Sequence, residues 1–492
     1  MTSPDINEIF DAVKESRKRP ISKRGEATVQ NAYDFAKQAH KGQKRKSGEP
    51  YFNHVFATAL NAARFGMDTD TIVAGFLHDT VEDTDITEQQ LEQKFGPEVA
   101  FLVQGVTKLG TLKYHGRERH VASLRKFFIA SAEDPRVIII KLADRLHNLQ
   151  TLGAMSDRPD KQKRIALESI EIHAPLAYRL GIGKLAGEIN DLAFPFAYPK
   201  EFETTEELLR QKKNLTMKYL EKVYKKIIKE MAKNGITDAK TEYRAKGKWS
   251  LYKKLHKKDM DIDKIYDIVA LRVMVPNVED CYRVLGMIHN MWRPLPGRIK
   301  DYIALPKPNG YQSLHTTIFT GDGGIAEIQI RTPEMHAQAE YGIASHFSYK
   351  HGESKTAPKK AWLKELGQVQ KEEEKSDVFM KNLTDDFFVD RIFVLTPEGD
   401  VIDLPQGATA LDLAYMIHSD IGNHATGAKI NGKFGALKAI LSNGDIVEIK
   451  HDKKKGKPSS KWLDWAKTTM AKKQIQKWLK ENGGSGFFNV FS

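Results

Sequence analysis

The sequence has only one cysteine, Cys281, among its 492 residues. A single cysteine excludes an intrachain disulfide and a zinc site built from cysteine thiolates, and it is typical of proteins that work in the reducing cytoplasm. Long apolar runs are also missing, because the N-terminus is polar and no stretch has the length of a membrane span or a secretory signal. We therefore expect a cytoplasmic protein with no membrane partner.

The sequence further lacks a GxxxxGK(S/T) loop, which disfavours kinases and ATPases of the P-loop class. It does carry a net charge of +13, with 40% hydrophobic and 29% charged residues. This excess favours polyanionic partners such as nucleotides or RNA, although a solvated basic surface explains the charge equally well. At ordinary domain sizes of about 100–200 residues, a chain of this length predicts three or four domains.

The spacing of apolar residues changes along the chain. It is helical at first, whereas three later segments rich in β-branched residues are expected to form strands: Ile265–Val275, Ser313–Phe319 and Ile325–Arg331. The expected divisions are a helical domain 1–195, a helical connector 196–235 closed by Asn234-Gly235, a mixed α/β domain 236–352, a linker 353–388, a small β-rich domain 389–450 and a basic helical tail 451–492.

Residues that suit a metal site gather in three segments of the helical region: His54; His78, Asp79, Glu82 and Asp83; and Asp144, Asn148 and Thr151. Positions 78 and 82 are one helical turn apart, so we expect them on one face of one helix. Two histidines and two carboxylates from three helices can hold a divalent ion, which turns bound water into a nucleophile near neutral pH. The carboxylates just beyond them can orient or deprotonate that water.

A lone His-Asp pair is more often structural than catalytic. The string HDTVEDTD is harder to explain in that way, because its carboxylates repel one another unless a cation binds there. Metal-dependent hydrolysis is therefore the favoured interpretation. The ligand set alone would also suit iron or zinc.

These strings resemble a known family. The spaced His…His-Asp…Asp pattern is similar to that of HD phosphohydrolases, and RKSGEPYFNH, GFLHDTVEDTDIT, VTKLG, KLADRLHNLQTL and APLAYRLGI resemble the hydrolase domain of the RelA/SpoT (Rel) family. The resemblance implies an all-α HD domain whose Mn²⁺ is bound by His54, His78, Asp79 and Asp144. It implies Glu82 and Asp83 as the water-activating pair, and a guanosine nucleotide pocket lined by Arg45, Lys46, Ser47, Asn148 and Thr151.

The middle region combines basic, aromatic and acidic segments. YRAKGKWSLYKKLHKK suits a triphosphate and a stacked base, and PKPNGYQS forms a turn that would present Tyr311 as an aromatic platform. Asp267 begins one expected strand, and Glu327 lies on the polar face of another with Gln329 and Arg331. Two carboxylates on neighbouring strands can hold magnesium against phosphates. Each signal alone is weak, because basic runs and polar-face carboxylates usually face solvent.

Together these segments resemble the synthetase domain of the same family, which has a mixed α/β, nucleotidyltransferase-like fold. The resemblance implies transfer of pyrophosphate from ATP to the 3′-hydroxyl of GDP or GTP, with release of AMP. The residues that it implies are Arg244, Lys246 and Lys254 for ATP, Asp267 and Glu327 for Mg²⁺ (Glu327 also as the base), Asn309 and Tyr311 for the guanine nucleotide, and His315 for a phosphate. The string RIKD at 298–301 resembles the basic form found in bifunctional members. Gly247-Lys248-Trp249 departs from the family, whose members often carry a different trio ending in tyrosine.

The segment RIFVLTPEGDVIDLPQGATALDLAYMIHSDIG resembles a TGS domain, a small β-grasp (ubiquitin-like) module. In the family this module contacts tRNA on the ribosome, which implies the same partners here. His418 fits contact with RNA and packing against a helix equally well, and the basic tail fits RNA or solvent. Long members of the family continue into further domains, so we expect either a natural short form or a shortened chain, and activation by the ribosome is left open.

The favoured hypothesis is a bifunctional enzyme of the stringent response that both makes and hydrolyses (p)ppGpp. Because two opposite reactions would waste ATP, we expect the two sites to be conformationally opposed, with the connector 196–235 as part of the coupling. Two alternatives stay open. One is a hydrolase whose synthetase domain is only regulatory, which the intact Asp267 and Glu327 disfavour, and the other is an RNA- or ribosome-binding module.

Overall fold

The computed structural model describes residues 4–16, 21–107, 126–307, 309–342 and 391–482. Its contacts divide the chain into two compact units, residues 1–372 and 373–492. The expected linker 353–388 and the end of the VTKLG string lie outside the described residues. None of the helices in the described ranges is both long and apolar enough to cross a lipid bilayer.

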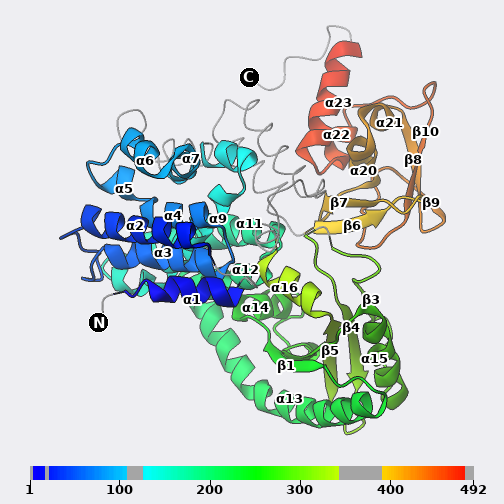
Figure 1. Ribbon diagram of the computed structural model, residues 1–492. Helices are drawn as coiled ribbons and strands as arrows, with labels where there is room; N and C mark the ends of the chain where they lie inside the picture. Colours follow the sequence, from blue (N-terminus) through cyan, green and yellow to red (C-terminus); the bar gives the residue numbers. More distant parts are fainter. Residues whose placement is uncertain (1–3, 17–20, 108–125, 308, 343–390, 483–492) are drawn as a thin grey trace. The chain divides into compact units, whose positions relative to one another are not determined.

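The first part of unit 1 is helical in all of its described regular elements, as the sequence predicts (Figure 1). The helices are α1 (Asn7–Ser16), α2 (Lys23–Ala39), α3 (Phe52–Arg64), α4 (Thr69–Leu77), α5 (Thr80–Asp83), α6 (Glu88–Phe95), α7 (Pro97–Val106), α9 (Arg136–Gln150), η1 (Leu152–Met155), α10 (Pro159–Glu168), η2 (Ser169–His173), α11 (Ala174–Arg179) and α12 (Gly183–Ala197). Side-chain caps start several of them, such as Asp68, whose carboxylate accepts the Thr71 N–H at 2.8 Å.

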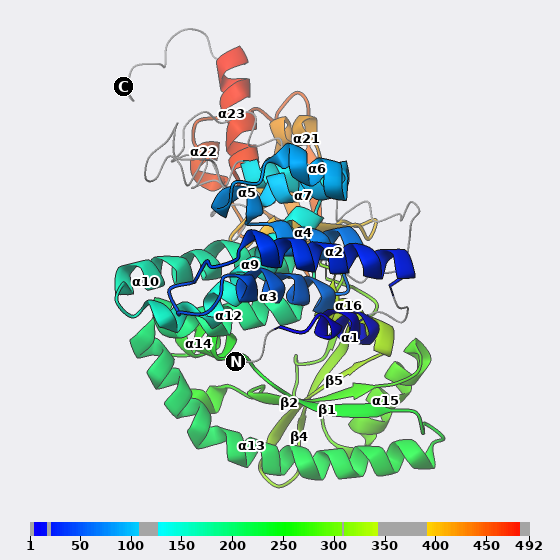
Figure 2. The same ribbon diagram turned by 60° about the vertical axis from the view of Figure 1, so that its left-hand side comes forward.

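Helices α3, α4 and α9 lie side by side at the centre of this helical part (Figure 2). Gly75 allows the close approach of α4 to α3, because a Cβ at this position would lie 3.0 Å from the Ala59 Cα. One expectation is wrong here: α4 ends at Leu77 and α5 begins only at Thr80, so His78 and Glu82 do not share one continuous helix. The break places His78 at the end of α4, facing α3 and α9.

The second part of unit 1 is a mixed α/β domain. Its elements are α13 (Pro199–Lys233), β1 (Lys240–Ala245), α14 (Lys248–His256), η3 (Ile262–Lys264), β2 (Val269–Met274), α15 (Val278–Met291), β3 (Lys300–Asp301), β4 (Leu314–Phe319), β5 (Ile325–Arg331) and α16 (Pro333–Tyr341). The strand order is β1-β2-β5-β4-β3, with β2 and β5 parallel and the other pairs antiparallel. The expected strands and the long helix α13 are present. Asn234 and Gly235 follow the last residue of α13, and the φ angle of Gly235 is +77°.

The sheet has an apolar face and a polar face. The apolar face packs against α13 and α15 (Figure 2) through a core that includes Leu220, Val223, Ile227, Leu271, Val273, Val284, Ile288, Ile328 and Ile330. The later half of α13 is thus part of this core. On the polar face, Ala270 lies opposite Glu327 and Arg272 opposite Gln329. At the end of β5 this face is covered by α16, because Arg331 is 0% exposed and its Nη2 lies 2.8 Å from His336 Nδ1.

Unit 2 is a small β-rich domain with helices on it. Its elements are β6 (Arg391–Leu395), β7 (Val401–Pro405), α20 (Ala410–Ile417), α21 (Ser419–Asn423), β8 (Ala425–Ile430), β9 (Lys433–Gly435), β10 (Val447–His451), α22 (Trp462–Trp465) and α23 (Thr469–Asn482). Strands β6 and β7 form an antiparallel hairpin, and β10-β8-β9 form a second antiparallel sheet. Asn431 and Gly432, with φ of +49° and +82°, make the turn between β8 and β9 that the Asn-Gly pair predicts.

A buried carboxylate joins the tail helices to α20. Asp412 caps α20 by accepting the Thr409 N–H at 2.8 Å, and it also accepts the N–H groups of Lys467 at 3.0 Å and Thr468 at 2.8 Å. Around it, Leu411, Ala414, Trp462 and Ile475 share one apolar cluster. The exposed His418 accepts the Asp420 N–H at 3.1 Å and so caps α21. Its contact with RNA stays a prediction.

Candidate functional sites

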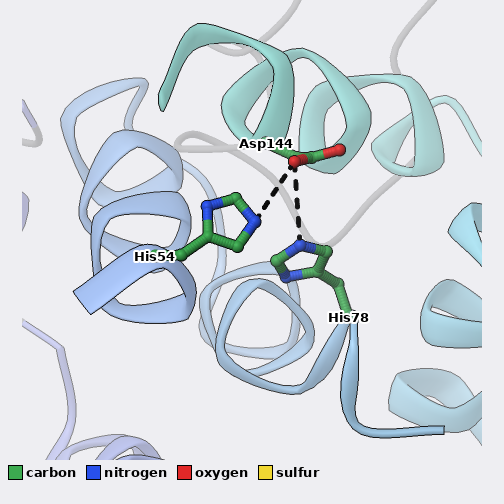
Figure 3. A group of neighbouring side chains, drawn as sticks. All are labelled: His54, His78 and Asp144. Atoms are coloured by element: carbon green, nitrogen blue, oxygen red, sulfur yellow. Dashed lines mark ion pairs between the residues drawn. The ribbon is translucent and has the colours of Figure 1, made fainter. Parts of the chain in front are cut away.

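Three buried side chains from α3, the end of α4 and α9 converge in the helical part (Figure 3). His54 Nε2 lies 3.4 Å from Asp144 Oδ1, and His78 Nε2 lies 3.9 Å from the same oxygen. Asp79 Oδ2 is close to both imidazoles, at 3.3 Å from His54 Nε2 and 3.1 Å from His78 Nε2. The four expected ligands therefore lie together, and two nitrogen and two oxygen donors at these distances suit a divalent cation.

Hydrogen bonds orient both histidines for binding a metal ion. His78 Nδ1 lies 2.9 Å from the Gly75 carbonyl, to which it donates, and this bond turns the buried Nε2 toward Asp79 and Asp144. His54 Nδ1 lies 2.9 Å from His147 Nδ1. Burial, together with the charges of His54 and Arg45, lowers the pKa of His147 to about 3, so this ring is neutral. Its Nδ1 also lies 3.1 Å from the Arg45 guanidinium, which can only donate, so Nδ1 is the acceptor and His54 is the donor. Such outer partners fix the tautomer of a metal-binding imidazole.

The two buried carboxylates remain ionised. Burial raises the pKa of Asp79, but the charges and hydrogen bonds of His78 and His54 outweigh burial and hold that pKa well below its usual range. For Asp144, Lys141 and the same histidines have this effect. Two buried, ionised carboxylates held beside two histidines form a site that a divalent cation stabilises. The HD fold and this cluster together support a divalent metal ion.

Tyr51 is a member of this site that sequence reasoning missed. Its hydroxyl lies 2.6 Å from Asp83 Oδ2 and 2.9 Å from Asp79 Oδ2, and so joins a candidate water-activating carboxylate to a candidate ligand. Burial and the charge of Asp79 raise the pKa of the phenol, which therefore stays a donor. The Tyr51 ring stacks on His40 with centroids 4.9 Å apart, and Gln43 Nε2 donates to the Asp83 carbonyl at 2.7 Å.

The residues expected to bind the guanosine nucleotide fall into two groups. Arg45 donates to Thr151 Oγ1 at 3.0 Å and to the Asn148 side chain, which itself donates to Asp144. Lys46 and Ser47 lie on the exposed side of the same turn, where Ser47 bonds Glu49.

Glu82 and Asp83 are exposed beside a hollow of about 520 Å³ that gives water access to them. Their roles stay predictions.

The second site lies at the edge of the mixed sheet. Asp267 precedes β2, and its Oδ2 accepts hydrogen bonds from Lys246, after β1, and from Lys254 on α14. Burial raises the pKa of Asp267, but the two lysines outweigh burial and lower it to about 2. The carboxylate is therefore ionised, and its two partners are ammonium groups, which also suit phosphate oxygens.

Glu327 on β5 is close to the rest of the expected set. Its Oε1 lies 3.3 Å from His315 Nδ1 and accepts the Gln329 side chain at 3.0 Å. Burial raises the pKa of Glu327, but His315 and Gln329 more than offset burial, so the group stays ionised. His315 Nε2 lies 2.7 Å from the Tyr311 hydroxyl, which extends the network toward the expected base platform.

Lys307 is a second residue that sequence reasoning missed. Its Nζ lies 4.7 Å from the centroid of the Tyr302 ring and 5.2 Å from that of Tyr311. Burial lowers the pKa of Lys307 to about 8, and the cations of Lys300, Arg244 and Lys254 act in the same direction. Lys307 and these neighbouring cations, which include the expected Arg244 on exposed β1, form a basic group at this site.

Asn309 is engaged elsewhere in this structure. Its Nδ2 donates to the Tyr178 carbonyl of α11 at 3.3 Å, and its Oδ1 accepts the Tyr311 N–H at 3.2 Å. Contact with a guanine nucleotide stays a prediction for this residue. The bond to Tyr178 links the loop of the second site to the helices of the first part.

A helical HD-type domain, a mixed α/β nucleotidyltransferase-like domain and a small TGS domain follow one another in the chain. Family models match in the same order: an HD domain at residues 32–183, a region found in RelA / SpoT proteins at 243–354, and a TGS domain at 392–451. The chain belongs to the RelA/SpoT family.

Similar proteins match most of the chain. A guanosine-3′,5′-bis(diphosphate) 3′-pyrophosphohydrolase of Aquifex aeolicus is 46% identical over 92% of this chain and 64% of its own length. A GTP pyrophosphokinase of Myxococcus xanthus is 44% identical over 92% of this chain and 60% of its own length. The bifunctional (p)ppGpp synthase/hydrolase SpoT of Escherichia coli is 41% identical, with coverages of 92% and 64%. The chain thus spans about three fifths of the length of these relatives.

Proposed function

We propose that this chain is a bifunctional alarmone enzyme. In one site it transfers pyrophosphate from ATP to the 3′-hydroxyl of GDP or GTP, giving (p)ppGpp and AMP. In the other it hydrolyses (p)ppGpp to GDP or GTP and pyrophosphate. The observation that carries the proposal is the presence in one chain of both the buried His54–His78–Asp144 cluster and the Asp267 carboxylate held by Lys246 and Lys254.

In the hydrolase site, His54, His78, Asp79 and Asp144 would hold a divalent ion, which we propose to be Mn²⁺. When bound, such an ion lowers the pKa of a water ligand and offsets phosphate charge. Glu82 or Asp83 takes the proton of the attacking water, whose oxygen bonds to the phosphorus attached to the 3′-oxygen. The bond between that phosphorus and the 3′-oxygen breaks, and the nucleoside oxygen regains a proton. Arg45 binds phosphate or base from the side of Asn148 and Thr151.

In the synthetase site, Asp267 and Glu327 would hold Mg²⁺, which offsets charge on the triphosphate when bound. Arg244, Lys246 and Lys254 bind ATP, and Tyr311 stacks on the guanine of the acceptor. Glu327 takes the proton of the 3′-hydroxyl as its oxygen bonds to the β-phosphorus of ATP, and the bond to the α-phosphate oxygen breaks to release AMP. Positioning and charge neutralisation supply most of the rate in such a transfer.

We further propose that the two activities are conformationally opposed. The hydrogen bond from Asn309 to the Tyr178 carbonyl supports this, because it connects the acceptor loop of one site to a helix of the other domain. Binding of tRNA or the ribosome through the TGS domain, and a cytoplasmic location, are likewise proposed.

The test is a pair of assays with purified protein and radiolabelled nucleotides. One contains ATP, GDP or GTP, and Mg²⁺, and the other contains ppGpp and Mn²⁺. Each is repeated with Glu327→Ala and with Asp79→Ala. We expect both activities, with synthesis lost only in the first variant and hydrolysis lost only in the second.

Hydrolysis alone would favour the hydrolase with a regulatory synthetase domain. Activity in neither assay, with salt-sensitive tRNA binding that survives both substitutions, would favour the RNA-binding module instead. Full activity of both sites in one mixture would contradict the proposed opposition.

A further inference from the structure

One lysine of the proposed ATP site lies on helix α14, and a second lies just before the start of this helix. Lys254 lies in its last turn and bonds Asp267, and Lys246 precedes its N-cap, Gly247. Leu251 and Leu255 are buried in the core of the sheet domain and fix one side of the helix. The position of its first turn therefore depends on whatever holds the N-terminus of α14.

That N-terminus is held by a carboxylate from another helix. Asp191 lies on α12, at the end of the helical part, and its Oδ1 accepts the Trp249 N–H at 3.0 Å. Gly247 supplies no capping side chain, and a Cβ there would lie 2.7 Å from Asp191 Oδ2. The missing side chain at Gly247 thus leaves the space that the carboxylate of Asp191 occupies.

Aromatic rings secure the same junction. The ring of Trp249 stacks on Tyr198, between α12 and α13, with centroids 5.4 Å apart and an interplanar angle of 19°. It also meets Phe194 of α12 edge-on, with centroids 5.0 Å apart. Lys248 Nζ bonds Glu206 of α13 at 2.7 Å and lies 4.7 Å from the centroid of Phe202.

Each member of the trio Gly247-Lys248-Trp249 touches α12 or α13. We propose that Asp191 is a positioning residue for synthesis: by capping α14 from α12, it sets Lys246 and Lys254 in place for ATP. The role rests on the proposed synthetase activity. Asp191 acts through the helix and touches no substrate.

The experiment compares Asp191→Ala, Asp191→Asn and the wild-type full chain. Loss of a helix cap typically corresponds to a factor of about 2–30, so we expect Asp191→Ala to raise the KM for ATP roughly five- to thirtyfold. The KM for GDP and the rate of ppGpp hydrolysis should stay within about twofold of wild type, which shows an intact fold. Asp191→Asn, whose amide oxygen still accepts one N–H, should recover most of the loss.

A second variant tests the mechanism. Gly247→Ala should displace the Asp191 carboxylate and raise the KM for ATP in the wild-type background, but add less than about twofold in the Asp191→Ala background, because the two changes then remove the same contact. Full additivity of the two changes would overturn the proposal, as would a KM for ATP in Asp191→Ala equal to that of wild type.

Equilibrium binding of ATP separates this proposal from the proposed function. If the wild-type protein binds ATP but makes no product, the synthetase assignment fails, and weaker ATP binding by Asp191→Ala still supports the positioning role. Unchanged ATP binding in Asp191→Ala overturns the role even where the wild-type protein is an active synthetase. Failure of the wild-type protein to bind ATP would overturn both.

Discussion

The two candidate sites hold their carboxylates in different ways. In the helical site, Asp79 and Asp144 face imidazole rings that Gly75 and His147 orient from behind, and only Asp144 also bonds a lysine, Lys141, at 3.1 Å. In the sheet site, Asp267 is already neutralised by two lysines. The first arrangement is suited to a resident cation. In the second, an incoming metal ion and triphosphate must share the carboxylate and the ammonium groups between them, so cation and substrate should bind together.

The largest effect is expected when a proposed metal ligand of the helical site is removed. His78→Ala should abolish tight Mn²⁺ binding and lower ppGpp hydrolysis by roughly 10³-fold or more, because bound water is no longer activated. Calorimetric titration with Mn²⁺ checks the first effect, and synthesis should be unchanged. His173→Ala is a matched control, since His173 is also buried but lies outside the cluster. Undiminished Mn²⁺ binding by His78→Ala would rule out this site.

The second largest effect is expected when Asp267, the carboxylate that both lysines bond, loses its charge. Asp267→Asn should lower the turnover of synthesis by roughly 10²–10³-fold, since charge neutralisation by a metal ion contributes several kcal/mol. Binding of ATP without metal should be kept or strengthened, because Lys246 and Lys254 are released from the anion. Titrations of ATP binding with and without Mg²⁺ separate the effect of the substitution on the metal ion from its effect on the nucleotide. If metal-free ATP binding fell as well, Asp267 would not be competing with ATP for the two lysines, and the contrast between the two sites would be wrong.

A smaller effect is expected at Tyr51. Tyr51→Phe removes only the hydroxyl that joins Asp79 and Asp83, and the loss of such an outer partner costs roughly 10–100-fold. We expect this loss in hydrolysis alone, measured as ppGpp turnover at saturating Mn²⁺. Tyr33→Phe is the matched control, because the Tyr33 hydroxyl bonds the Pro4 carbonyl. Equal rates in the two variants would show that the hydroxyl of Tyr51 has no such role.

The smallest effect concerns pH and Lys307. With a pKa of about 8, this lysine is charged below pH 8 and neutral above it, whereas a bound anion would favour the charged form. The KM for nucleotide in synthesis should therefore rise as pH increases from 7 to 9, by at most about tenfold per unit. Lys307→Arg stays charged throughout and should flatten the rise. The same slope in both proteins would assign the change to another group.

The sequence predicted most of the helical site because its ligands come in compact strings. His78-Asp79 and the KLADRLHNLQTL segment identify themselves by residue type and spacing. Tyr51 and His147 lie inside such strings but gave no signal of their own, since a tyrosine before Phe52 fits a core position and a histidine on a helix is common. Only packing of α3 against α9 brings the His147 ring to within hydrogen-bond distance of His54.

The break between α4 and α5 escaped prediction for a different reason. Residues 78–83 have the composition and spacing of a helix, whereas in the structure the His78 ring bonds the Gly75 carbonyl and faces Asp144 of another helix where α4 ends. Likewise, strand alternation predicted the polar face of β5, but not that α16 buries Arg331 on it. The cap that Asp191 provides joins positions far apart in sequence, and local patterns carry no trace of it.

Asp412 has a practical consequence for dividing the chain into separately expressed pieces. A fragment of unit 2 ending near residue 451 follows the family boundary but omits Lys467 and Thr468, whose N–H groups bond that carboxylate. The anion would lose buried donors, at a cost of about 1–3 kcal/mol or more, and the apolar surface under Trp462 and Ile475 would face water. Such a fragment should be prone to aggregation, and one that runs to residue 482 should not.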